Sequence, residues 1–229
     1  MTNLRILYED NHLIAVNKFP SDLVQADKTG DTALDDRVRE YIRRKYNKPG
    51  DVFLGVIHRL DRPVSGVVLY ARTSKALARM NEMFRNREIT KIYWAVVEDL
   101  PPADEGILEH YLVRNRQQNK SYAHQRPVKG GKPAHLHYRL TGRAQKYFFV
   151  EINLVTGRHH QIRAQLAKAG CRIKGDLKYG ASRSNKDGSI HLHARALTFI
   201  HPVRKTKIVI TADPPKDTLW DLFVPGDFI

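Results

Sequence analysis

The sequence contains a single cysteine, Cys171, among its 229 residues. An internal disulfide needs two cysteines and a cysteine-based zinc knuckle needs several, so both are excluded. No apolar run approaches the roughly 18–20 residues that cross a bilayer, and residues 1–5 lead into alternating sequence without the apolar stretch of a signal peptide. We therefore expect a soluble, cytoplasmic protein that does not bind a membrane.

Several catalytic signatures are also missing. The chain has no Gly-x-x-x-x-Gly-Lys-Ser/Thr phosphate loop and no Gly-x-Ser-x-Gly nucleophile motif. Among its 11 histidines, three short spacings could pair metal ligands, namely His58-x-x-Asp61, His159-His160 and His191-x-His193. None of these is a recognised zinc signature, so we expect no metal site.

Acidic residues are scarce. Lys and Arg number 39 against 24 Asp and Glu, which gives a net charge of +15 and a pI near 10.0. Residues 111–150 hold nine basic and no acidic residues, and residues 155–174 hold five basic and again no acidic residues. Four tyrosines lie within the first of these stretches. Because basic groups neutralise phosphates and aromatic rings stack on unpaired bases, the pattern favours RNA binding over a basic face kept for solubility.

Many strands with irregularly interspersed helices are predicted from the apolar pattern. Helices are expected at 32–46, 74–86, 159–169 and 217–223. The first is capped by Asp31 or Thr32 and carries an apolar stripe of Leu34, Val38, Tyr41 and Ile42, and Gly170 closes the third. Strands are expected at 4–8 and 13–16, which the turn 9–12 joins into a hairpin, and at 66–71, 89–97, 147–154, 190–200, 207–211 and within the basic stretch. There is no internal repeat, low-complexity tract or linker. We predict a single α+β domain over residues 1–229, with a large mixed, mainly antiparallel, curved sheet flanked by helices.

The first segment with chemical potential is residues 55–66, Gly-Val-Ile-His-Arg-Leu-Asp-Arg-Pro-Val-Ser-Gly. It places Asp61 between Arg59 and Arg62. Neighbouring cations favour the charged form of a carboxylate, and an ionised carboxylate can act as a nucleophile or base. The alternative is a loop aspartate that only holds one of these arginines, and the segment alone leaves both interpretations open.

The second segment is residues 156–165, Thr-Gly-Arg-His-His-Gln-Ile-Arg-Ala-Gln, which open a predicted helix. A helix N-terminus attracts anions, which favours the docking of a phosphate or a substrate carbonyl there. Ile162 and Leu166 are expected to face inward, with Arg163 next to this buried face. Arg163 is therefore either part of a site or a salt bridge that packs the helix on the sheet.

Five segments, in order along nearly the whole chain, resemble landmarks of the RluA-like family of RNA pseudouridine synthases. Residues 58–66 resemble the family's His-Arg-Leu-Asp-x-x-Thr-Ser-Gly, and residues 157–163 its Gly-Arg-Thr-His-Gln-Ile-Arg. Residues 91–97 resemble its Lys-x-Tyr-x-Ala-x-Val strand, and residues 175–180 and 192–194 match two later landmarks. Val64 and His159 stand where threonine is usual, and the early Lys-Pro-x-Gly element appears as Lys-Phe-Pro-Ser-Asp at 18–22.

This resemblance implies the pseudouridine synthase catalytic fold without an N-terminal S4-like domain, and an RNA pseudouridine synthase that needs no cofactor. Asp61 would be the nucleophile once the target uridine has flipped out of its stack. Tyr93 would pack on the base, and Arg163 would pair with Asp61. The expected partner is a stem-loop of tRNA or large-subunit rRNA, bound by a monomer through His58, Arg59, Arg62, Lys91, Lys129, Lys132, Arg158 and His160.

Two other functional classes stay open. A non-catalytic RNA-binding or ribosome-associated protein on the same fold would explain the charge and the aromatic residues. It would not require Asp61, Tyr93 and Arg163 to occur together. A metal-dependent nuclease would use His58, Asp61 and His191 or His193, and the sequence lacks the further carboxylate ligands expected of such a site.

Overall fold

The computed structural model describes residues 4–26 and 30–224, and the chain divides into two compact units. The first unit comprises residues 1–89 and 194–214, and the second comprises residues 90–193 and 215–229. Each unit has its own set of paired strands and its own buried apolar cluster. A single domain over residues 1–229 stays a prediction.

The sheet of the first unit begins with the predicted hairpin. Strands β1 (Arg5–Glu9) and β2 (Leu13–Lys18) pair antiparallel, and β2 pairs antiparallel with β4 (Ser65–Ala71). The next strand beside β4 is formed by residues 194–200 of β10 (Leu192–Ile200). The short β3 (Gly55–Val56) pairs with β4, and β11 (Lys207–Thr211) pairs with β10. Both β2 and β4 are buried along their whole length, which explains their nearly continuous apolar sequence.

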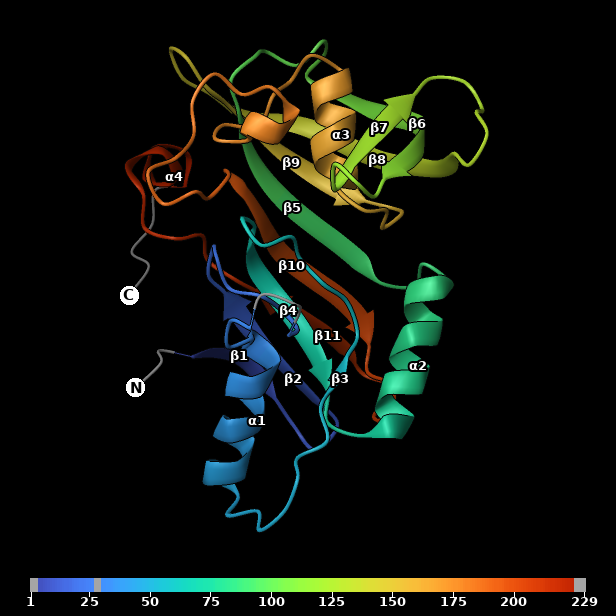
Figure 1. The fold of residues 1–229 in the computed structure, drawn as a ribbon, viewed down its shortest axis with the longest axis vertical. Helices are drawn as coiled ribbons and strands as arrows, with labels where there is room; N and C mark the ends of the chain where they lie inside the picture. Colours follow the sequence, from blue (N-terminus) through green and yellow to red (C-terminus); the bar gives the residue numbers. More distant parts are fainter. Residues whose placement is uncertain (1–3, 27–29, 225–229) are drawn as a thin grey trace. The chain divides into compact units, whose positions relative to one another are not determined.

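Two amphipathic helices belong to the first unit (Figure 1). Helix α2 (Ser74–Arg85) starts at Thr73, whose side chain accepts a hydrogen bond from the Ala76 amide, and it packs Met80 into the core. Helix α1 (Leu34–Lys45) buries Leu34, Val38 and Ile42, which recur every four residues on one face.

The predicted side-chain cap of α1 is wrong. Its N-cap residue is Ala33, and neither Asp31 nor Thr32 caps the helix. The Leu34 amide instead donates to the Leu23 carbonyl at 2.7 Å. A backbone carbonyl of the preceding loop therefore accepts the hydrogen bond of an N-terminal helix amide, a role that a capping side chain has in other helices.

The second unit contains an antiparallel sheet in the order β5-β9-β8-β6-β7 (Figure 1). Its strands are β5 (Thr90–Val97), β6 (Glu105–Asn115), β7 (Lys120–His124), β8 (Lys132–Arg143) and β9 (Phe148–Leu154). The basic stretch 111–150 therefore forms strands joined by exposed loops, as predicted. Alternating burial along β6 and β8 shows that one face of the sheet is covered and the other is solvated.

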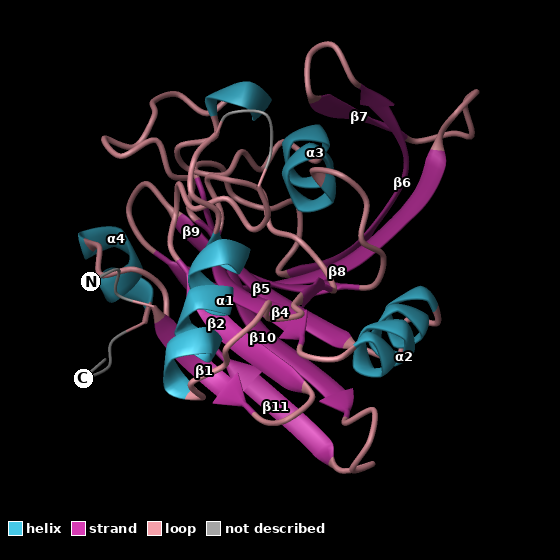
Figure 2. Cartoon of the chain, turned by 60° about the horizontal axis from the view of Figure 1, so that its bottom comes forward, coloured by secondary structure: helices cyan, strands magenta, loops and turns pink. Residues whose placement is uncertain are grey.

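Helix α3 (Gln161–Lys168) packs against β6 and β7 (Figure 2), and a short 3-10 helix, η1 (Leu177–Tyr179), follows it. Gly170 ends α3 with a φ of +83°, as predicted from its position. Helix α4 (Thr218–Phe223) is capped by Asp217 and packs Trp220 against Phe149. The fold is α+β with mainly antiparallel pairing, so the predicted fold class is confirmed. No helix in the described part of the chain is long and apolar enough to span a membrane.

Candidate active site

Asp61 lies in the segment that joins β3 to β4. The Val64 amide donates to the Asp61 carbonyl at 3.0 Å, which closes a turn. The Ser21 amide donates to the Arg62 carbonyl at 2.9 Å, and the Arg62 guanidinium pairs with Asp31 at 2.8 Å. The backbone on the C-terminal side of Asp61 is therefore fixed, while the Asp61 side chain is half-buried.

A buried lysine holds the same turn from the sheet. Lys18 is the last residue of β2 and has an exposed fraction of 0%. Its Nζ donates to three carbonyls, those of Phe19 at 2.9 Å, Arg62 at 3.0 Å and Val64 at 2.6 Å. The three acceptors match the three N–H donors of an ammonium group. Burial lowers the pKa of Lys18 to about 7, although the charges of Asp22 and Asp61 oppose the shift.

The ends of the 58–66 motif are fixed by different means. His58 Nε2 accepts a hydrogen bond from the Leu69 amide at 3.1 Å, and the ring stacks on Phe84. Gly66 has a φ of +116°, and a Cβ there would stand 2.3 Å from the Ala194 carbonyl oxygen. Only glycine fits this approach, so Gly66 and Ala194, the last residues of two of the motifs, meet inside the first unit.

In the second unit, Arg163 on α3 forms a buried ion pair. Its Nε and Nη2 donate to the two carboxylate oxygens of Asp176, each at 2.7 Å, and the two side chains are 6% and 0% exposed. Two parallel bonds fix the plane of the guanidinium. Arg163 therefore forms a salt bridge, but this bridge joins the 157–163 motif to the 175–180 motif and not the helix to a strand of the sheet.

Tyr179 makes a second connection between these motifs. Its hydroxyl accepts from the Ser121 amide at 2.8 Å and lies 3.0 Å from His160 Nδ1. His160 is 8% exposed, and its ring stacks on that of His159 with the centroids 3.8 Å apart. Burial, with the positive charge of Arg163 next in size, lowers the pKa of His160 to about 2. The His160 ring is therefore neutral throughout the physiological range.

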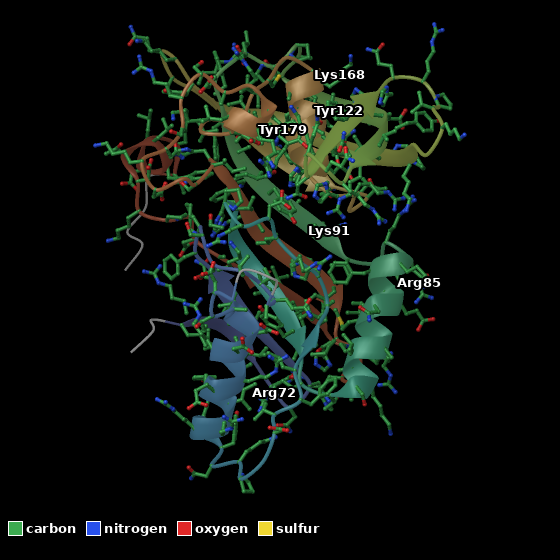
Figure 3. All side chains as sticks on the ribbon, in the orientation of Figure 1. Arg72, Arg85, Lys91, Tyr122, Lys168 and Tyr179 are labelled. Atoms are coloured by element: carbon green, nitrogen blue, oxygen red, sulfur yellow. The ribbon has the colours of Figure 1, made fainter. Side chains whose placement is uncertain are left out.

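Lys91 and Tyr93 lie on β5, two residues apart and hence on the same face of the strand. Both are 8% exposed. A Cβ at Gly157 would stand 3.9 Å from Lys91 Nζ. The side chain of Lys91, which is labelled on β5 in Figure 3, therefore reaches the segment that precedes α3. The buried amine of Lys91 therefore lies beside the segment that was predicted to bind an anion.

The other predicted RNA-binding residues are more exposed. Arg158 Nε donates to the Pro133 carbonyl at 3.1 Å, next to the exposed Lys132 at the start of β8. Lys129 is exposed in the loop between β7 and β8. In the first unit, exposed Arg59 lines a pocket of about 400 Å³ together with His58, Gln25, Arg39, Leu54, Val56 and Ile57.

The predicted site residues thus divide between the units. His58, Arg59, Asp61 and Arg62 belong to the first, and Lys91, Tyr93, Lys129, Lys132, Arg158, His160 and Arg163 to the second. Sequence reasoning missed the anchors Lys18, Asp176 and Tyr179. Two signals were available, because Lys18 is a charged residue that ends an apolar strand and Asp176 is the first acid after the acid-free stretch 155–174.

Residues 12–168 match the family model described as RNA pseudouridylate synthase. The chain belongs to this family. The predicted resemblance and the predicted enzyme class, an RNA pseudouridine synthase and hence an isomerase, are therefore confirmed.

Two curated relatives are similar over most of this chain. The ribosomal large subunit pseudouridine synthase C of Buchnera aphidicola subsp. Acyrthosiphon pisum is 34% identical over 92% of this chain and 68% of its own length. The tRNA pseudouridine synthase C of Pectobacterium carotovorum is 30% identical over 92% of this chain and 59% of its own length. The chain therefore spans roughly 60–70% of the length of these two relatives.

A solved structure shares the fold. Human RNA Pseudouridylate Synthase Domain Containing 4 superposes with a TM-score of 0.79 at 23% identity, over 95% of this chain and 91% of the human chain. The agreement covers nearly all of both chains, so the architecture described above is the pseudouridine synthase fold.

Proposed function

We propose that this chain converts uridines in structured RNA to pseudouridine, with Asp61 as the nucleophile. The observation that carries the proposal is the anchored turn after Asp61, in which Lys18 holds the carbonyls of Arg62 and Val64. Such an anchor orients one half-buried carboxylate in a segment that also carries the family motif. A nucleophile must be held within a fraction of an ångström of its productive position, and this turn supplies that constraint.

The reaction breaks the bond between uracil N1 and ribose C1′ and forms a bond between C5 and C1′. The C5 hydrogen leaves as a proton, and N1 gains one, so the isomerisation is redox-neutral and needs no cofactor. In our proposal the Asp61 carboxylate attacks either the uracil ring or the ribose anomeric carbon, and it is released when the rotated base rejoins the sugar.

Arg163 and Tyr93 complete the proposed chemistry. Arg163 supplies the cation that pairs with Asp61. A guanidinium has five N–H donors, and the pair with Asp176 uses two of them while fixing the plane of the group. Tyr93, 8% exposed on β5, packs on the target base and helps to remove its proton.

The target uridine must leave its stack to reach a carboxylate. Flipping costs a few kcal/mol and less in a loop or bulge, so we propose a stem-loop with an exposed or weakly paired uridine. One relative is named for tRNA and another for the large subunit of the ribosome. Either RNA is therefore a candidate substrate. A monomeric state and a cytoplasmic location stay predictions.

Neither alternative class gains support from a specific feature. Among residues 4–26 and 30–224, no group of three or more His, Cys, Asp or Glu side chains is placed to hold a metal ion, as the nuclease would require. A non-catalytic RNA-binding protein would have no use for an anchored Asp61 turn.

The deciding experiment is tritium release from RNA labelled at uridine C5, with tRNA and large-subunit rRNA transcripts offered separately. We expect release by the wild type, and a loss of about a thousandfold or more in Asp61→Asn, because removal of a nucleophile typically costs that much or more. Asp51→Asn, at an exposed position of the same unit, is the matched control. Release retained within tenfold in Asp61→Asn would refute the nucleophile assignment.

A further inference from the structure

The turn between β6 and β7 is fastened to the start of α3 by a histidine. His159 Nδ1 lies 2.9 Å from Ser121 Oγ, and His159 Nε2 lies 3.1 Å from Asn119 Oδ1. An amide oxygen only accepts, so Nε2 carries a proton and Nδ1 of the neutral ring accepts from the serine hydroxyl. One side chain thereby contacts both the turn and the first residues of β7.

Two residues of η1 hold the same turn from a second direction. Lys178 Nζ donates to the Asn119 carbonyl at 3.2 Å. The Tyr179 hydroxyl is bound to both backbone groups of Ser121, accepting from the amide at 2.8 Å and lying 3.1 Å from the carbonyl. Asn119 has a φ of +45°, a conformation that asparagine tolerates better than most residues. The turn is therefore held in one position.

This fixed turn presents cations and an exposed ring. Arg114, Arg116 and Tyr122 are exposed, with Tyr122 at 41%. Lys120 Nζ lies 5.5 Å from the centroid of the Tyr122 ring and 5.1 Å from that of Tyr179, so the ammonium stands against both aromatic rings. No acidic residue occurs between 111 and 150, so no nearby sequence neighbour neutralises these charges.

We infer that this surface, formed by Arg114, Arg116, Lys120 and Tyr122 and here called the hairpin junction, binds an unpaired strand of the substrate RNA, and that His159 is its positioning residue. The inference rests on the proposed function. The cations would contact the phosphates, and the Tyr122 ring would stack on a base. Positive charge interleaved with an exposed aromatic ring matches a polynucleotide better than an anionic lipid surface, which offers no base to stack.

His159 stands where the family usually has threonine, a residue too short to reach both Ser121 and Asn119. The β6–β7 turn of this chain is therefore fixed by a contact that the family motif does not supply. A positioning role predicts that removal of the ring raises the RNA concentration needed for half-maximal rate, with the main change in KM and not in kcat.

The test measures binding apart from chemistry. Fluorescence anisotropy with labelled tRNA and large-subunit rRNA transcripts gives Kd and its dependence on salt, and tritium release gives KM and kcat. The variants are the double substitution Arg116→Gln/Lys120→Gln, and His159→Ala. His137→Ala, an exposed histidine of β8 in the same unit, is the control.

We expect the double substitution to reduce the salt slope by about 2, because each phosphate contact contributes about 1. We expect His159→Ala to raise Kd and KM about 3- to 10-fold, the result of losing about 1 kcal/mol of hydrogen bonding that orders the turn. Hydrogen exchange of amides 116–121 should accelerate in His159→Ala and stay unchanged in His137→Ala.

Three outcomes would overturn the inference. The first is a salt slope that does not change in the double substitution. The second is a Kd that does not change in His159→Ala although the turn exchanges faster. The third is wild-type protein that binds anionic vesicles as tightly as it binds RNA. Failure of the proposed function has a different signature. In that case the wild type would release no tritium from either RNA, while the binding differences among the variants would still be measurable.

Discussion

In the first unit, the segment that carries Asp61 is held by a buried lysine whose ammonium meets backbone carbonyls. In the second unit, the helix that carries Arg163 is held by a guanidinium paired with a buried carboxylate. The first anchor is a single charge that meets peptide dipoles, and burial lowers the pKa of Lys18 to about 7. The second is a bidentate ion pair. Two anchors in one protein can thus both be buried and yet respond differently to pH and to substitution.

The largest expected effect follows from breaking the ion pair. Asp176→Asn removes the buried carboxylate that binds Arg163 through two hydrogen bonds, and breaking a buried ion pair typically destabilises a protein by about 3–5 kcal/mol. Urea unfolding measures this loss. Asp104→Asn is the control, because Asp104 pairs with Arg143 at an exposed position, and such pairs contribute about 0–1 kcal/mol. Equal losses in the two variants would contradict the special role of the buried pair.

Lys18 should make the free energy of unfolding depend on pH. Between pH 7 and 9 the unfolded chain keeps the proton of Lys18, whose ordinary pKa is 10.5, whereas the folded protein releases it because its pKa is about 7. The unfolded state then binds more protons, so stability rises with pH, by about 2 kcal/mol over this window. Lys18→Met removes the titrating group. The unfolding free energy should therefore rise between pH 7 and 9 in the wild type and not in the variant. Parallel pH dependences of the two proteins would contradict the prediction.

His160 should give a smaller effect on the acid side. Its pKa of about 2 in the folded protein lies below the ordinary 6.5, so between pH 7 and 5 only the unfolded chain gains a proton. Stability then falls as pH falls, by about 1–2 kcal/mol. His160→Asn keeps a side-chain donor and acceptor near Tyr179 without titrating, and its unfolding free energy should change less between pH 7 and 5. If the unfolding free energy of the wild type falls no more between pH 7 and 5 than that of the variant, the titration of His160 is not the cause of the acid sensitivity.

Local pattern predicted most elements because each has a short-range cause. The alternation and turn residues of 4–18 predicted the hairpin, and the spacing of Leu34, Val38 and Ile42 predicted α1. The cap of α1 was mispredicted because its partner, the Leu23 carbonyl, is a backbone group that no residue type signals. A salt bridge that packs the helix on the sheet was one of two interpretations of Arg163. The partner that the structure shows, Asp176, comes next to Arg163 only because the chain between them folds back.

The chemical inventory of this protein can be read from its amino-acid order, namely a net positive charge, an aspartate close to two arginines and a Gly-Arg-His-His-Gln segment that leads into a helix. That order also determined the family, because five motifs in order are a property of the chain alone. How these groups are held follows from the folded chain and not from local sequence. Lys18 meets Val64 across 46 positions and His159 meets Asn119 across 40, and contacts at such separations depend on strand order and register, which local propensity does not encode.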